Sequence, residues 1–155
     1  MMKRILIALV LIIFIQSDAD LYDPERIYNA IIGLKAKYPT GYPWTEENTY
    51  VWGEQIAKGL GLTKYTGYGC AAFAMIASDA AFGDIPVYKF FDRSKIRVGD
   101  ILRIHNDTHF VIVLKIREDS LYTVAEGNIG SMVYYGRVID LEETGFTFGF
   151  TRYKE

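Results

Sequence analysis

The sequence predicts an α+β domain in which N-terminal helices pack on one face of a five-stranded antiparallel sheet. Up to Gly83 the apolar residues recur mainly with the spacing of helices, whereas the segments after Gly83 have the pattern of extended strands. The connections between those strands are short, and connections of that length join antiparallel neighbours. Helices first and strands second is the order typical of the α+β class.

The chain begins with a segment typical of an export signal. Lys3 and Arg4 precede an uncharged apolar run, residues 5–15, and Ser17 and Ala19 place small residues at the two positions that a signal peptidase reads. We therefore expect cleavage after Ala19. Because the apolar run is shorter than the roughly 20 residues that span a bilayer, we expect no membrane anchor after cleavage.

Residues 1–19 are accordingly interpreted as the signal peptide and residues 20–155 as one domain. The composition, 50% hydrophobic and 23% charged, is that of a compact domain with a substantial core. The net charge is −2, and no run of Lys or Arg follows the signal, so the electrostatic attraction for nucleic acid is missing. We expect a secreted, cell-wall-associated monomer that meets peptides, cell-wall polymer or another protein.

Two helices are expected before the cysteine. Asp23 followed by Pro24 predicts a capped helix start, and an apolar stripe continues this helix to about Lys37. Thr45 can cap a second helical stretch that runs through about Lys58. A turn-rich segment with two prolines separates these helices.

A third helix and the strands follow. Four glycines among residues 59–69 predict a mobile loop, and the Ala-rich apolar run from Cys70 to near Gly83 predicts a buried central helix. The segment that starts at His109 is apolar on both faces and is therefore expected in the centre of the sheet. The five expected strands are residues 101–106, 109–117, 121–126, 132–140 and 146–153.

The polar residues that this layout brings together indicate thiol chemistry. Cys70 is the only cysteine of the chain, whereas secreted proteins that build disulfides carry cysteines in even number. In the first turn of a helix, the unpaired N–H groups and the positive end of the macrodipole favour its thiolate. His109 can serve as its base. Glu126 and Asn128 lie two residues apart in an extended segment, so they are expected to point to one side, where one of them orients the imidazole.

Other interpretations of these residues stay open. Cys70 also fits a small side chain of an Ala-rich core, and the segment from Glu126 to Asn128 also fits a turn. His105 competes with His109, which is preferred because it begins the central strand. Two histidines and one cysteine without a short-spaced ligand pair make a poor zinc site, so we expect no metal and no other cofactor.

The order of a cysteine, a histidine at a strand start and Glu-x-Asn at the end of the next strand resembles the CHAP group, the cysteine- and histidine-dependent amidohydrolases and peptidases of the NlpC/papain-like superfamily. The resemblance spans about residues 50–140. It implies a papain-like fold and hydrolysis of amide bonds in peptidoglycan stem peptides or cross-bridges. Cys70 matches the nucleophile, His109 the base, Glu126 the orienting acid and Asn128 the accessory amide.

The same resemblance covers aromatic residues before the cysteine. The segment with Tyr50 and Trp52 is similar to the aromatic segment that NlpC-type enzymes place upstream of the nucleophile, and with Tyr68 these residues are expected to bind substrate. The Gly99–Asp100 pair resembles the step that opens the first strand in that superfamily. Two rival functions stay open: an inactive wall- or peptide-binding module of the same fold, and a transglutaminase-like acyl transferase.

Overall fold

The computed structural model describes residues 18–118 and 120–154. The expected export signal therefore lies almost entirely outside the described residues. None of the described helices combines the length and the apolar character that crossing a bilayer requires.

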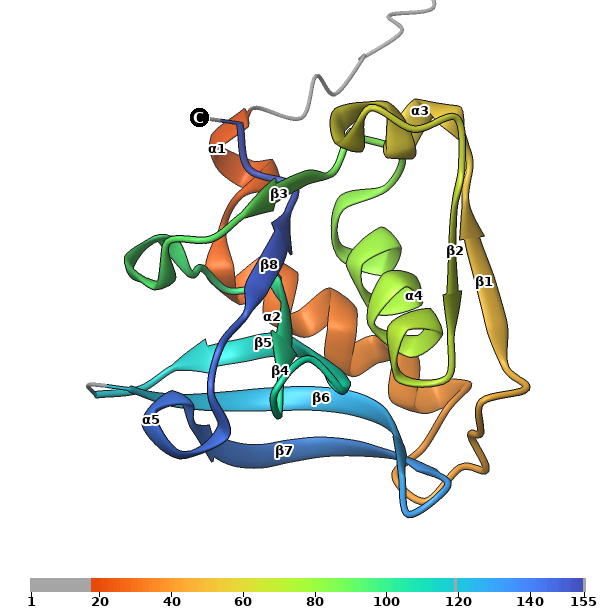
Figure 1. Ribbon diagram of the computed structural model, residues 1–155, viewed down its shortest axis with the longest axis vertical. Helices are drawn as coiled ribbons and strands as arrows, with labels where there is room; N and C mark the ends of the chain where they lie inside the picture. Colours follow the sequence, from red (N-terminus) through yellow and green to blue (C-terminus); the bar gives the residue numbers. More distant parts are fainter. Residues whose placement is uncertain (1–17, 119, 155) are drawn as a thin grey trace, which may run out of the picture.

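The main sheet has six strands in the described part of the chain, and each pair of neighbours is antiparallel (Figure 1). In the order in which they lie side by side, the strands are β3 (Tyr88–Phe90), β8 (Phe148–Thr151), β4 (Ile101–Ile104), β5 (His109–Ile116), β6 (Leu121–Ile129) and β7 (Met132–Asp140). The expected combination of helices with an antiparallel sheet is confirmed, and the expected number of five strands is wrong.

The two ends of the sheet explain the difference. β3 has only three residues, two of them exposed, and it follows Pro86, so its sequence lacks the pattern of a longer strand. β8 follows the short helix α5 (Leu141–Thr144) and returns to lie between β3 and β4. The expected meander therefore holds for β4 to β7 but not for the last strand.

A separate two-stranded ribbon replaces the helix expected from Thr45 to Lys58 and the glycine-rich loop after it. β1 (Thr49–Trp52) pairs with β2 (Tyr65–Tyr68), and β-branched and aromatic side chains favour this extended pairing. Thr45 closes a turn instead of capping a helix, because its backbone N–H donates to Asn48 Oδ1 at 2.8 Å. Helical structure in this region is limited to α3 (Glu54–Ala57) and η2 (Lys58–Leu60).

The first and third expected helices are confirmed. The short helix α1 (Asp18–Leu21) precedes α2 (Pro24–Gly33), which begins where Asp23 Oδ2 accepts a hydrogen bond of 2.7 Å from the backbone N–H of Arg26. A turn of 3₁₀ helix, η1 (Leu34–Ala36), continues α2. α4 (Cys70–Phe82) ends before Gly83, whose φ of +66° stops the helix.

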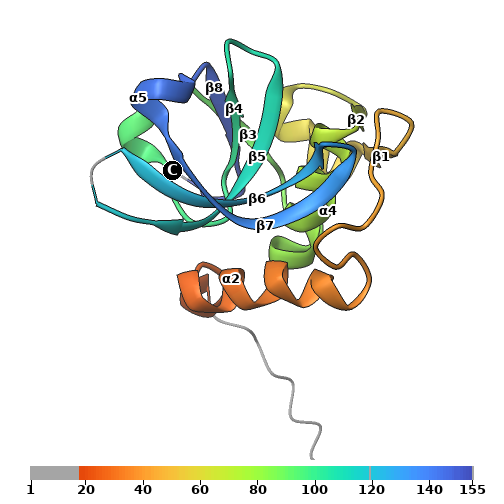
Figure 2. The ribbon, with the colours of Figure 1, turned by 90° about the horizontal axis from the view of Figure 1, so that it is seen from below.

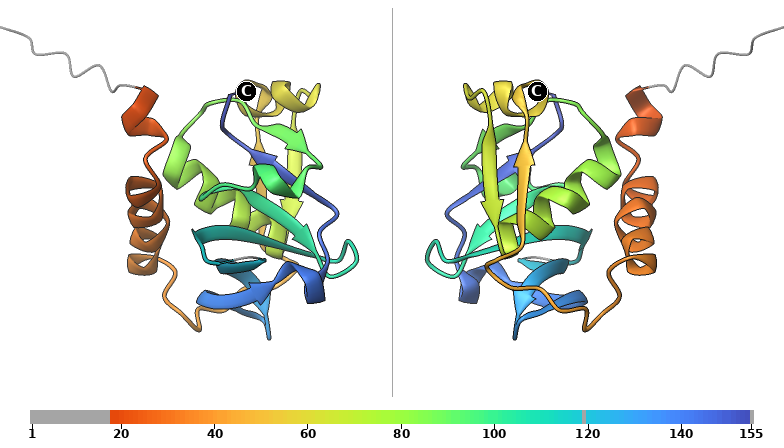
Figure 3. Two further views of the ribbon diagram at one scale, coloured as in Figure 1. Left: turned by 90° about the vertical axis from the view of Figure 1, so that its left-hand side faces the viewer. Right: turned by 90° about the vertical axis from the view of Figure 1, so that its right-hand side faces the viewer.

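The central position of α4 explains its apolar composition. The ribbon β1–β2 lies on one side of α4 and the main sheet on another (Figure 1), while α2 forms an outer layer against it (Figures 2 and 3). A helix enclosed in this way is hydrophobic all round. β5 is buried on both faces, as expected for a central strand: Phe110, Ile112 and Leu114 belong to the core around α4, and Val111 and Val113 to a second core.

Candidate active site

The start of α4 presents Cys70 to the main sheet. Gly69 has a φ of +50°, a left-handed conformation that suits glycine, and this turn connects β2 to the helix. Cys70 is the first helical residue and is 8% exposed, so its thiol meets solvent only at an edge. The backbone N–H of Phe110 in β5 donates a hydrogen bond to this sulfur.

His109 joins the cysteine to an acid. It begins β5 opposite Ile104 of β4, and it is 9% exposed. Its imidazole hydrogen-bonds with the Cys70 side chain, and its Nε2 lies 2.9 Å from Glu126 Oε2. Because Glu126 occupies Nε2, Nδ1 is the ring nitrogen left for the sulfur. The structure therefore joins Cys70, His109 and Glu126 in one line of side-chain contacts.

These contacts favour a thiolate–imidazolium pair. Burial opposes ionisation of Cys70, but the hydrogen bonds from His109 and from the Phe110 N–H, together with the charge of His109, lower the pKa of the thiol. Burial likewise opposes the charged form of His109, yet its hydrogen bonds and charge interactions with Cys70 and Glu126 raise the pKa of the imidazole to about 9. Because the two groups are coupled, the pair titrates as a unit.

Arg137 completes the line and was not among the residues expected from the sequence. The Glu126 carboxylate is fully buried, and it is bonded by Arg137 through Nε at 2.5 Å and through Nη2 at 2.6 Å. Burial would raise the pKa of Glu126, but the hydrogen bonds and charges of Arg137 and His109 lower it, which keeps the carboxylate ionised. Arg137 lies in β7 opposite Val124 of β6, two residues before Glu126. The pairing of Arg137 with Glu126 therefore becomes visible only when the register of the two strands is known.

Asn128 does not join this line. Its φ is +61°, and the pairing of β6 is irregular between Glu126 and Ile129, so the side chain of Asn128 turns away from that of Glu126 and its Nδ2 donates to Glu46 Oε1 at 2.5 Å instead. Gly127 itself has a packing role. A Cβ at this position would lie 2.6 Å from Cβ of Phe73 in α4, so glycine permits the close approach of β6 to the helix.

His105 stays outside the line as well. Its φ is +53°, its side chain is exposed, and its ring centroid lies 6.1 Å from that of His109. The imidazole bonded to Glu126 is that of His109. This geometry supports the preference for His109 over His105.

The three aromatic residues expected to bind substrate lie at different ends of α4. The Tyr50 hydroxyl donates to Asp79 Oδ2 at 2.9 Å and Trp52 Nε1 donates to Asp79 Oδ1 at 2.8 Å, and Arg152 forms an ion pair with the same carboxylate. Asp79 follows Cys70 by nine residues, which is roughly 13 Å along a helix. Tyr50 and Trp52 are therefore not beside the cysteine, whereas Tyr68, 56% exposed, is close to it along the chain.

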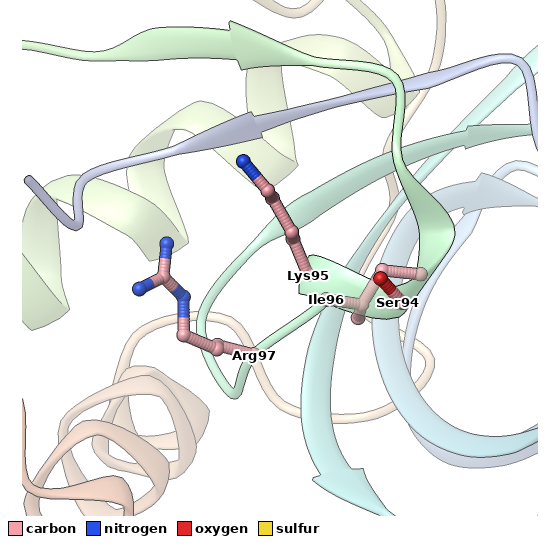
Figure 4. A pocket seen from close by; sticks show the side chains of 4 residues that line it. All are labelled: Ser94, Lys95, Ile96 and Arg97. Carbon is pink, nitrogen blue, oxygen red and sulfur yellow. The ribbon is translucent and has the colours of Figure 1, made fainter. Parts of the chain in front are cut away.

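A cavity of about 440 Å³ lies away from the candidate site, and its lining residues include neither the cysteine nor the histidine (Figure 4). The short 3₁₀ helix η3 (Arg93–Lys95) and the two residues after it line this cavity, and the Arg97 guanidinium stacks on the Tyr153 ring at 4.0 Å. Asp100, three residues after Arg97, is fully buried, and its Oδ2 accepts a hydrogen bond from the backbone N–H of Arg97 at 2.8 Å. Burial raises the pKa of Asp100 to about 7.

The arrangement can perform nucleophilic catalysis. The first N–H groups of α4 have no partner within the helix, so they can donate to an oxyanion that forms beside Cys70.

In the described part of the chain, no group of three or more His, Cys, Asp or Glu side chains is placed to hold a metal ion. Comparisons with protein-family models, with curated proteins and with solved structures find no match for this chain. The resemblance to the CHAP group therefore stays a prediction.

Proposed function

We propose that this chain is a cysteine-dependent amidohydrolase or endopeptidase with a papain-like arrangement of Cys70, His109 and Glu126. The observation that carries the proposal is the position of His109, whose imidazole contacts the nucleophile through one nitrogen and a buried carboxylate through the other. A core cysteine would need neither contact. Arg137 supports the proposal because it keeps the orienting carboxylate charged.

The chemistry proceeds in two steps. The Cys70 thiolate attacks the amide carbonyl carbon, a C–S bond forms, and the helix N–H groups stabilise the oxyanion. The His109 imidazolium gives its proton to the amide nitrogen, the C–N bond breaks and the amine leaves. His109 then takes a proton from water, the hydroxide attacks the thioester, and the carboxylic acid leaves as the Cys70 thiolate is restored. Glu126 orients the imidazole throughout.

The substrate class proposed from the resemblance is the stem peptides or cross-bridges of peptidoglycan, met by a secreted protein at the cell wall. The test incubates the purified protein with peptidoglycan and analyses the released fragments by mass spectrometry. Cys70→Ala and His109→Ala should each lower turnover by on the order of 10³-fold, because neither group has a substitute. His105→Ala is the matched control and should leave turnover nearly unchanged.

Three other results of this experiment would contradict the proposal or support one of the rival functions. Wild-type hydrolysis by Cys70→Ala would show that the nucleophile is wrong. If no fragment is released but the wild type and Cys70→Ala bind peptidoglycan equally well, the protein is a binding module. If an added amine is incorporated into the fragments in preference to water, the reaction is acyl transfer.

A further inference from the structure

A loop held by several hydrogen bonds lies against Gly69, the residue before the nucleophile. Trp44 Nε1 donates to the carbonyl of Gly69 at 2.8 Å, and the N–H of Gly69 donates to the carbonyl of Asn48 at 2.8 Å. Within the loop, the turn between Thr45 and Asn48 is closed by a further hydrogen bond. The loop 44–48 is therefore held in place relative to Cys70 by its own bonds and by two bonds to Gly69.

This loop carries Glu46 to the edge of the candidate site. A Cβ at Gly69 would lie 2.8 Å from the carboxyl atoms of Glu46, so the carboxylate lies directly against the backbone that leads into Cys70. Glu46 Oε1 accepts from Asn128 of β6, and the Glu46 side chain is exposed. The negative charge of Glu46 opposes ionisation of the Cys70 thiol, as expected of a nearby anion.

The other charges of the site are matched, whereas that of Glu46 is not. The Cys70 thiolate is matched by the His109 imidazolium, and the Glu126 carboxylate by the Arg137 guanidinium. Glu46 bonds a neutral amide, and in residues 18–118 and 120–154 no salt bridge includes it. An exposed anion beside a nucleophile attracts cations to it and repels other anions.

We infer that Glu46 selects substrates that carry a positively charged amino group beside the amide bond that is cleaved. The inference rests on the proposed hydrolase function and narrows its substrate class to amine-bearing peptides. The ammonium group can be an α-amine or a side-chain amine, because both offer the same charge and the same N–H donors to the carboxylate.

Small thiol reagents test the inference without a known substrate. The rates at which Cys70 reacts with 2-aminoethyl methanethiosulfonate, a cation, and with 2-sulfonatoethyl methanethiosulfonate, an anion, are measured at low ionic strength. Glu46→Gln keeps the shape and the acceptor for Asn128 but removes the charge. Since one nearby charge speeds the cation and slows the anion, the cation/anion rate ratio should fall by about 5- to 10-fold. Glu46→Lys should lower the ratio further.

Glu47→Gln is the matched control, because Glu47 is an exposed neighbour in the same loop, and it should change the ratio by less than about twofold. If Cys70 reacts readily but Glu46→Gln leaves the ratio unchanged, the inference is overturned and the proposed function stands. If neither reagent reacts with Cys70 faster than with a free thiol, the proposed function falls with it.

Peptides identify the source of the amine. For a peptide that the wild type cleaves, acetylation of the selected amine should lower kcat/KM in the wild type and have little effect in Glu46→Gln. One peptide is acetylated at the α-amine and another at the side-chain amine, and the form that loses kcat/KM names the source. Equal cleavage of both acetylated peptides and the free peptide would overturn the inference.

Discussion

Replacing Glu126 by glutamine should narrow the pH range in which the thiolate–imidazolium pair exists. The pKa of His109 rises from its ordinary 6.5 to about 9, which corresponds to roughly 3 kcal/mol of preference for the imidazolium. Cys70 and Glu126 supply this preference together against the cost of burial. Glu126 supplies part of this preference, so glutamine removes on the order of 1 kcal/mol and lowers the pKa of His109 toward its ordinary value.

The acid side of the range should move in the opposite direction. A less stable imidazolium stabilises the thiolate less, so the pKa of Cys70 should rise in Glu126→Gln. NMR titration of His109 measures the first change, and the pH dependence of Cys70 alkylation measures the second. A His109 titration midpoint that stays within about 0.3 of the wild-type value would refute the role assigned to the carboxylate.

Glu142→Gln is the matched control for this experiment. Glu142 also pairs with an arginine, Arg93, at 2.5 Å, but its side chain is 64% exposed. Exposed pairs contribute little to stability, so this variant should leave the His109 titration and the free energy of unfolding nearly unchanged. The comparison separates the loss of a buried charge from the substitution itself.

Two further predictions concern stability. Gly127→Ala should lower the free energy of unfolding by about 1–3 kcal/mol, because its Cβ would lie 2.6 Å from Cβ of Phe73. Gly53→Ala is the control and should lower it much less, because a Cβ at Gly53 would meet no atom within 4 Å. Equal losses of the two variants in denaturant melts would contradict the packing role of Gly127. The pKa of Asp100 is raised in the folded protein from its ordinary 3.8 to about 7. Its contribution to stability is therefore fully present below about pH 3.8 and is lost as the pH rises through about 7. Asp100→Asn should therefore gain stability relative to the wild type between pH 5 and pH 8 in thermal melts, by on the order of 2–3 kcal/mol, and a constant difference would disprove this linkage.

Sequence reasoning succeeded where one local pattern dominates. The uninterrupted apolar run after Cys70 specified α4, and the run after His109 specified a strand buried on both faces. The three residues that meet at the candidate site were found because a single cysteine, a histidine at a strand start and Glu-x-Asn at the end of the next strand stand in the order that resembles the CHAP group. Their contact required only that β5 and β6 pair and that α4 pack on them.

The errors arose where distant pairing decides the structure. The β-forming residues Thr49–Trp52 needed β2 as a partner, and the signal of a helix cap at Thr45 was stronger than that of the pairing. Asn128 was assigned to the side of Glu126 on the assumption of an extended chain, which its positive φ breaks. Arg137 could not be connected with Glu126 before the register of β6 and β7 was known.

The position of β8 has a consequence for when the protein can fold. β8 fills the space between β3 and β4, and Arg152 just after it bonds the carbonyls of Gly83 and Ile85 beyond the end of α4. Contacts between such distant parts of a chain form late and slow the folding reaction. A chain that emerges with its N-terminal part first must therefore wait for residues 148–152 before its sheet is complete, and until then the groups around Cys70 lack their finished framework.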